Sequence, residues 1–237
     1  MIIRNKKTFT IGVALLLSFV VIYAFIMSPR FGNGRNGLQY SDDMFNSLSK
    51  GSAYFITDQA EVVEAQRGNQ INVTLKASSP EDAAKWSKLY TGAGADVTIK
   101  DSSITVKGDL GKILDSALAD SDSMYNNDGK ALETRYGYDA REATYNWYAS
   151  FKNMDGALKK NEQFKEAAAV TKIQQKAVEP AYNYYGVEIK HVSDNKASVS
   201  FMLIFYLIYT MWYGFGLFYL FDGLGITTSK SKKAESH

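Results

Sequence analysis

Residues 8–28 read TFTIGVALLLSFVVIYAFIMS, and residues 199–221 read VSFMLIFYLIYTMWYGFGLFYLF. Neither stretch contains an Asp, Glu, Lys, Arg or His residue. Because a helix rises about 1.5 Å per residue, about 20 apolar residues cross the hydrocarbon core of a bilayer. The two stretches hold 21 and 23 residues, so each is long enough to span a membrane as a helix.

The first apolar stretch has two interpretations. A basic start followed by apolar residues is also typical of a cleaved secretory signal. The stretch is about twice as long as the apolar region of such a signal, and no small-residue cleavage motif comes before Ser28 and Pro29. We therefore expect an uncleaved signal anchor, and the cleaved signal is the alternative.

Basic residues beside the two stretches predict their orientation. Arg4, Lys6 and Lys7 precede the first stretch, and three lysines follow the second. Since cytoplasmic flanks carry an excess of Lys and Arg, we expect a two-pass inner-membrane protein with both termini cytoplasmic. Residues 29–198 then lie in the periplasm or its equivalent outside the cytoplasm. Four basic residues on the outer side weaken this bias: Arg30, Arg35, Lys190 and Lys196.

Composition excludes several classes of protein. The chain has a formal net charge of +2, and its basic ends leave about −2 for the body between the spans. Such a body lacks the clustered Lys and Arg that bind nucleic-acid phosphates, so no nucleic-acid partner is expected. The sequence has no cysteine, which excludes disulfides, iron–sulfur clusters, thiolate zinc sites and c-type haem attachment.

The middle of the chain predicts an α+β core. Ile71, Val73 and Leu75 alternate with polar residues, as in a half-buried strand. Ser79 is then a predicted N-cap, with Pro80 as the first residue of a helix that stops at Gly92 or Gly94. Two further strands are expected around residues 97–99 and 104–106.

Asp109 is the predicted N-cap of a second helix, which completes a β-α-β-β-α order. This order is most of a ferredoxin-like unit, and a fourth strand is expected from residues 187–192. Before the core, Ser41 is a predicted N-cap for a helix over residues 41–48. Residues 58–66 fit either a short helix or a strand.

A helical extension is expected after the core. Asp139 and Glu142 predict the start of a helix that runs to about residue 153, with a break at residues 154–156. A second helix is predicted over residues 161–178, and Pro180 breaks or kinks it.

These assignments divide the chain into eight segments. They are a cytoplasmic N-terminus (1–7), a first transmembrane helix (8–28), a juxtamembrane link with a short helix (29–68), the α+β core (69–125), a helical region (126–186), a juxtamembrane segment (187–198), a second transmembrane helix (199–221) and a cytoplasmic tail (222–237).

The two spans carry a candidate site for contact with a partner helix. In the first span, small side chains recur every fourth residue, which permits close helix approach. In the second, ten of 23 residues are aromatic, including tyrosines near the middle, whose hydroxyls find no partner among lipid tails. The predicted contact residues are Thr10, Ala14, Ser18, Phe201, Phe205, Tyr209, Trp212 and Tyr213.

The aromatic face has three possible interpretations. It can pack on the first span of this chain or lie against lipid, it can contact a helix of another subunit, or it can bind a flat apolar cofactor such as a quinone. We expect no bound cofactor. The absence of histidine and charge in both spans argues against ion conduction and haem ligation within them.

Side chains with catalytic or metal-binding chemistry are few. Asp120, Asp122 and Asp128 are a weak calcium candidate, but Tyr125 stands where an EF-hand loop has its glycine. His191, the one histidine before the tail, lies beside the second span, where we expect a surface role. No dinucleotide loop or P-loop is present in the sequence.

We therefore expect a non-catalytic accessory or scaffold subunit of a membrane-protein complex. Its partners would be the lipid bilayer and other membrane-protein subunits. The alternative is an extracytoplasmic sensor or ligand-binding protein that signals through a partner. A hydrolytic or redox enzyme is the third possibility.

Overall fold

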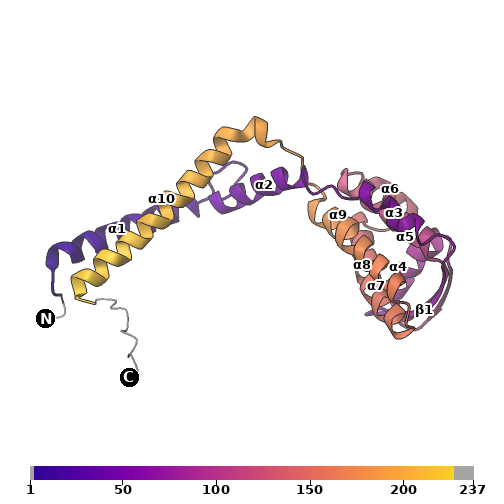
Figure 1. Cartoon of the computed structure of the whole chain (residues 1–237). Helices are drawn as coiled ribbons and strands as arrows, with labels where there is room; N and C mark the ends of the chain where they lie inside the picture. Colours follow the sequence, from indigo (N-terminus) through magenta and orange to yellow (C-terminus); the bar gives the residue numbers. More distant parts are fainter. Residues whose placement is uncertain (1–2, 227–237) are drawn as a thin grey trace, which may run out of the picture. The chain divides into compact units, whose positions relative to one another are not determined.

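The computed structural model describes residues 3–226, so residues 1–2 and most of the expected tail lie outside the described residues. The chain divides into two compact units (Figure 1). The first comprises Met1–Leu48 with Lys190–His237, and the second is Ser49–Ile189. The fold is a mixture of helices and one small three-stranded sheet.

Two helices of the first unit are long and apolar enough to span a membrane. They are α1 (Lys6–Ile26) and α10 (Val192–Leu224). The N-terminal end of α1 lies beside the C-terminal end of α10, where the Arg4 and Asn5 amides donate to the carbonyl of Gly223 at 2.9 and 3.0 Å. The two helices are therefore antiparallel.

Helix α2 (Gly37–Lys50) starts four residues earlier than predicted. The Asn36 carboxamide accepts from the Gln39 amide at 2.9 Å, and the Gln39 side chain accepts from the Asn36 amide at 3.0 Å. These reciprocal bonds form a capping box. The prediction of Ser41 as N-cap is wrong, because its hydroxyl donates to the carbonyl of Gly37 from inside the helix.

The second unit contains the sheet, in which every neighbouring pair of strands is antiparallel. Its strands are β1 (Gln70–Lys76), β2 (Asp96–Lys100) and β3 (Ser103–Asp109), in the order β1-β3-β2. The alternation predicted for β1 is confirmed, since Ile71, Val73 and Leu75 are buried and the residues between them are exposed.

Two helices of the core follow the predicted order. Helix α4 (Pro80–Gly92) begins where the Ser79 hydroxyl accepts from the Asp82 amide, and α5 (Leu110–Tyr125) begins at Asp109. Both N-cap predictions are therefore confirmed. Helices α4, α5 and α7 contact the sheet, and their buried side chains join those of the strands in one apolar core.

The fourth strand expected from residues 187–192 is wrong. Residues 187–191 form neither helix nor strand, and Val192 begins α10. Residues 58–64 are helical, in a 3-10 turn (Thr57–Gln59) and α3 (Ala60–Glu64), and residues 65–66 form a turn. Helix α6 (Gly129–Tyr136) lies within the predicted helical region 126–186, although no separate helix is predicted at these residues.

The break predicted at residues 154–156 is also wrong, because α7 (Ala140–Lys160) continues through it. Met154 and Leu158 are fully buried on one side of the helix, and a Cβ atom at Gly156 would meet open space. Packing of the apolar side therefore outweighs the low helix propensity of glycine.

The helix predicted over residues 161–178 is divided. It consists of α8 (Phe164–Ile173), a π-helical segment (Gln174–Val178) and α9 (Glu179–Tyr184). Pro180 has no N–H, and its ring would collide with the carbonyl four residues before it in a regular helix. The wider turn before Pro180 accommodates that ring, so the predicted disturbance takes the form of a π-helix.

Candidate helix-contact site

Glycine residues bring α1 and α10 into close contact. A Cβ atom at Gly12 would lie 2.4 Å from the backbone nitrogen of Leu220, and one at Gly223 would lie 2.5 Å from the backbone of Phe9. Both distances are shorter than any tolerated contact, so a side chain at either position would push the helices apart. Gly12 and Gly223 are buried, although most residues of the two helices are exposed.

The residues of α10 that face α1 recur every three or four positions along the helix. The residues of this face that are partly or fully buried are Phe205, Tyr209, Trp212, Gly216 and Gly223. This spacing is the one by which two helices pack side chains between each other in a left-handed pair. The predicted aromatic face therefore lies partly against the first helix of the same chain.

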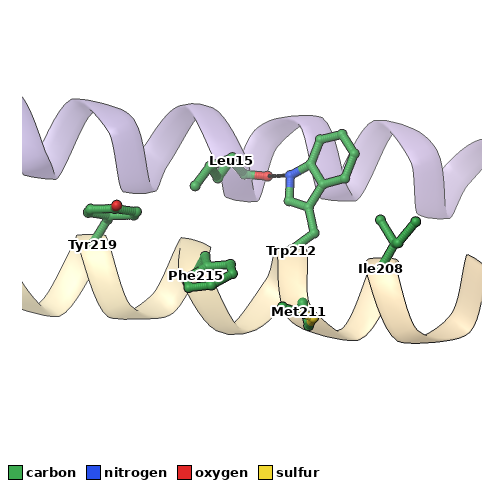
Figure 2. Close-up of a pocket in the computed structure, with 6 residues that line it drawn as sticks. All are labelled: Leu15, Ile208, Met211, Trp212, Phe215 and Tyr219. Carbon is green, nitrogen blue, oxygen red and sulfur yellow. Dashed lines mark hydrogen bonds between the residues drawn. The ribbon is translucent and has the colours of Figure 1, made fainter.

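Trp212 makes a polar contact inside this pair. Its indole nitrogen donates to the Leu15 carbonyl at 3.1 Å and to the Ser18 hydroxyl at 3.2 Å. Figure 2 shows the indole of Trp212 directed at the Leu15 carbonyl of the facing helix. Because a buried N–H group without an acceptor costs free energy, these bonds remove the cost of burying the indole N–H.

Aromatic rings extend the contact beyond Trp212. The Phe19 ring stacks on Tyr209 with centroids 4.2 Å apart, and it lies 5.1 Å from Tyr213 at a tilted angle. Phe205 also stacks on Tyr209, with ring centroids 5.6 Å apart. The Tyr209 hydroxyl is buried and has no hydrogen-bond partner within the described chain.

A shallow apolar groove runs along the same pair of helices (Figure 2). Its volume is about 440 Å³, and its lining is Leu15, Ile208, Met211, Trp212, Phe215 and Tyr219. None of its lining residues is charged.

The structure separates the predicted contact residues into two groups. Ser18, Phe205, Tyr209 and Trp212 lie at or near the contact between α1 and α10. The others project wholly or partly away from this contact and are exposed: Thr10, Ala14, Phe201 and Tyr213. Tyr213 belongs to both descriptions, because its ring touches Phe19 while 45% of the residue is exposed.

Sequence reasoning missed the glycines of this contact. Gly216 and Gly223 are seven residues apart, which puts them on one face of α10, and Gly12 is the single glycine of α1. Small residues in spanning helices mark close approach, so this spacing was an available signal.

In the second unit, Asp120 is buried at 2% exposure and accepts three hydrogen bonds. The donors are the Tyr136 hydroxyl, the Trp147 indole nitrogen at 2.8 Å and the Arg135 guanidinium. Burial raises the pKa of Asp120 above its usual range, and these donors oppose the shift. Both carboxylate oxygens are thereby engaged in the core.

The weak calcium candidate is not assembled. Asp122 accepts from Tyr54 and from Asn126, whereas Asp128 is exposed beyond the end of α5. Across residues 3–226, no group of three or more His, Cys, Asp and Glu side chains gathers in a way that could hold a metal ion.

Lys50 is a second buried charge in this unit, with 1% of the residue exposed. Its ammonium donates to the Tyr184 and Val187 carbonyls at 3.1 and 2.7 Å and to the Asn127 carboxamide at 3.2 Å. Burial lowers the pKa of Lys50. The ammonium thus connects the first residues of the second unit with its last residues by hydrogen bonds. No sequence pattern predicts this buried lysine.

His191 is exposed and directly precedes α10. Its carbonyl accepts from the Asn195 side chain at 3.0 Å, and no hydrogen bond to its imidazole ring forms among residues 3–226. A catalytic histidine needs a base or nucleophile within hydrogen-bond reach, and this one has neither.

Comparison with protein families, curated proteins and solved structures finds no match to this chain. Its function is therefore argued from its own residues.

Proposed function

We propose that this chain is a non-catalytic accessory or scaffold subunit of a membrane-protein complex. In this proposal α1 and α10 cross the inner membrane, both termini are cytoplasmic and residues 29–198 lie outside the cytoplasm. This arrangement is supported by the length and apolar character of the two helices and by their antiparallel pairing. It is also supported by three basic residues at one end of the pair: Arg4, Lys6 and Lys7. We also propose that the β-α-β-β-α core is a ferredoxin-like unit with three strands.

The observation that carries the proposal is a pair of exposed tyrosines on α10, with Tyr206 on its outer side and Tyr213 at the margin of the contact with Phe19. Tyr206 is 70% exposed and Tyr213 is 45% exposed, and Thr210 lies between them on the same side. The spacing of four and three residues places all three on one face. This face is separate from the glycines that contact α1.

Tyr206 and Tyr213 lie close to the centre of the expected span. Residue 210 is the midpoint of 199–221, so the two tyrosines are about 6 and 5 Å from it along the helix axis. The Thr210 hydroxyl donates to the Tyr206 carbonyl within its own helix. Neither phenol forms a hydrogen bond within residues 3–226.

A phenol surrounded by lipid tails has no hydrogen-bond partner, and its exposure there costs free energy. Polar side chains in spanning segments are accordingly turned towards other helices. A helix of another membrane protein packed on this face would supply acceptors for both hydroxyls. The face therefore fits a subunit contact better than it fits lipid.

The test is co-purification of the full chain in a mild detergent. We expect other membrane proteins to elute with it, and we expect Tyr206→Phe with Tyr213→Phe to reduce their yield. The matched control is Tyr23→Phe, which also removes an exposed hydroxyl but lies near the end of α1. Elution of the unchanged chain as a monomer without other proteins would contradict the proposal.

A further inference from the structure

Strand β1 is one edge of the sheet, because the strand order is β1-β3-β2. Its pairing with β3 is continuous over all seven residues and contains no bulge. At the two ends of the ladder, the Ala77 amide donates to Ser102 and the Leu110 amide donates to the Asn69 carbonyl, both at 2.8 Å. These bonds fix which residues face β3.

Hydrogen-bonded pairs alternate along an antiparallel ladder. Since residues 69 and 77 belong to such pairs, the N–H and C=O groups of Ile71, Val73 and Leu75 also point to β3. The N–H and C=O groups of the other four residues, at positions 70, 72, 74 and 76, point away from the sheet. No hydrogen bond from any other segment reaches them within residues 3–226.

This edge carries little protection against pairing. Natural sheets protect an edge with proline, a bulge, short length or several charges. Strand β1 has no proline and no bulge, and Lys76 is its one charged residue. The opposite edge, β2, is five residues long and has Asp96 and Lys100 at its ends. By these criteria β1 is the less protected edge of the sheet, although α7 also contacts it.

We propose that β1 pairs with β1 of a second copy of this chain. The pairing is antiparallel about a two-fold axis at Val73, which is the register that uses the full length of both strands. It places Gln70 opposite Lys76 of the second copy and Asn72 opposite Thr74 of the second copy. All outward backbone groups then gain partners, and the two sheets become one sheet of six strands.

The β1 sequence is complementary to itself in this register. On the exposed face, a Gln carboxamide meets a Lys ammonium and an Asn carboxamide meets a Thr hydroxyl, with no like charges opposed. On the buried face, Ile71 stands opposite Leu75, and Val73 stands opposite Val73 of the second copy. A two-fold contact of this kind closes after two chains and gives a dimer instead of a fibre.

This inference goes beyond the proposed function, because it concerns the sheet and not the outer face of α10. Its failure would leave the helix contact standing. The Tyr206 and Tyr213 variants likewise leave β1 unchanged, so the two proposals are tested separately.

Cysteine cross-linking in membranes tests the pairing directly, since the native chain has no cysteine. Two differently tagged full-length copies are co-expressed, one with Asn72→Cys and one with Thr74→Cys, and are then oxidised. In this register residues 72 and 74 form a hydrogen-bonded pair, whose Cα atoms are about 5.5 Å apart and within reach of a disulfide. We expect a mixed disulfide dimer that carries both tags.

The control is Thr98→Cys, on the same exposed sheet face but in β2, paired opposite Thr105. It should give no dimer. The pairing is overturned if the Asn72 and Thr74 variants give no mixed dimer, if Thr98→Cys dimerises equally, or if the β1 cysteines cross-link to a different protein.

A charge exchange tests the register. Gln70→Lys places the new lysine opposite Lys76 of the second copy. Because like charges then face each other, we expect loss of the dimer in native mass spectrometry of the full chain. In its own sheet this residue pairs with Asp109, so the fold tolerates the added charge. Adding Lys76→Gln to the same chain removes the repulsion and should restore the dimer. An unaffected Gln70→Lys dimer, or no restoration by the second change, would overturn the register.

Discussion

Gly12 of α1 lies directly against the backbone of Leu220 of α10. The nearest Leu220 atoms are its amide nitrogen and Cα, at 2.4 and 2.8 Å from the place where a Cβ atom on Gly12 would stand. Backbone atoms cannot move aside as the end of a flexible side chain can. The helices would therefore have to separate to admit even one methyl group.

We predict that Gly12→Ala destabilises the pairing of α1 with α10 by about 1–3 kcal/mol, the usual cost of overpacking a close contact. Reversible unfolding of the full chain in mixed micelles measures the change. The matched control is Gly214→Ala in α10, where an added Cβ atom meets nothing within 4 Å. Equal losses in the two variants would show that Gly12 is not a contact between the helices.

Trp212→Phe removes the indole N–H that reaches Leu15 and Ser18. Because hydrogen bonds between spanning helices contribute about 0.6 kcal/mol on average, we expect a loss of about 1 kcal/mol once the smaller ring is included. Ser18→Ala should cost less in the same unfolding assay, since the Leu15 carbonyl still accepts from Trp212 at 3.1 Å. A larger effect of Ser18→Ala than of Trp212→Phe would contradict this geometry.

Asp120→Asn tests the buried carboxylate of the body. The carboxamide would direct its own N–H groups at donors from Tyr136, Trp147 or Arg135, and at least one donor would lose its acceptor. We expect a loss of about 2 kcal/mol in the free energy of unfolding. The control is Asp128→Asn, at an exposed position just after the end of α5. It should change the free energy of unfolding by less than about 0.5 kcal/mol.

The local parts of the fold could be predicted from sequence, because their causes are local. The alternation in β1 and the N-caps Ser79 and Asp109 depend on residues within four positions of each other. The two long apolar helices likewise follow from composition and length. The capping box of Asn36 and Gln39 also depends on residues close together in the sequence. Ser41 and the acidic residues after it resemble a helix start as well, so the sequence offers two positions for the N-cap of α2.

Features that depend on distant residues could not be predicted in this way. Helix α7 passes through Gly156 because Met154 and Leu158 are buried in the core. The partners of Lys50 are 77 to 137 positions away in the chain. Which face of each long apolar helix packs inward also depends on the fit between the two helices, so the predicted stripe of Thr10 and Ala14 is left exposed in the structure.

Lys50 should give the stability of the chain a distinct dependence on pH. Its pKa in the folded chain lies below the ordinary value of 10.5, because burial disfavours the ammonium. Between the lowered pKa and 10.5, the unfolded chain binds more protons at this site than the folded chain does. The contribution of this group to stability therefore rises with pH across that interval and is lost as pH falls through the folded pKa.

We compare the full chain with Lys50→Met, which cannot titrate at this position. The free energy of unfolding of the native chain relative to the variant should increase as pH is raised towards 10.5. Chemical denaturation at several alkaline pH values measures it. A difference that stays constant or decreases with pH would mean that Lys50 is not a desolvated cation.

In the proposed arrangement, α1 and α10 cross a membrane and hold the body on its outer side. Labelling of single cysteines in intact cells tests it most directly, because the native chain contains none. A membrane-impermeant maleimide should react with Thr98→Cys from outside, and with Lys7→Cys only after the membrane is permeabilised. Labelling of Lys7→Cys in intact cells, with Thr98→Cys protected until permeabilisation, would show that this arrangement is wrong.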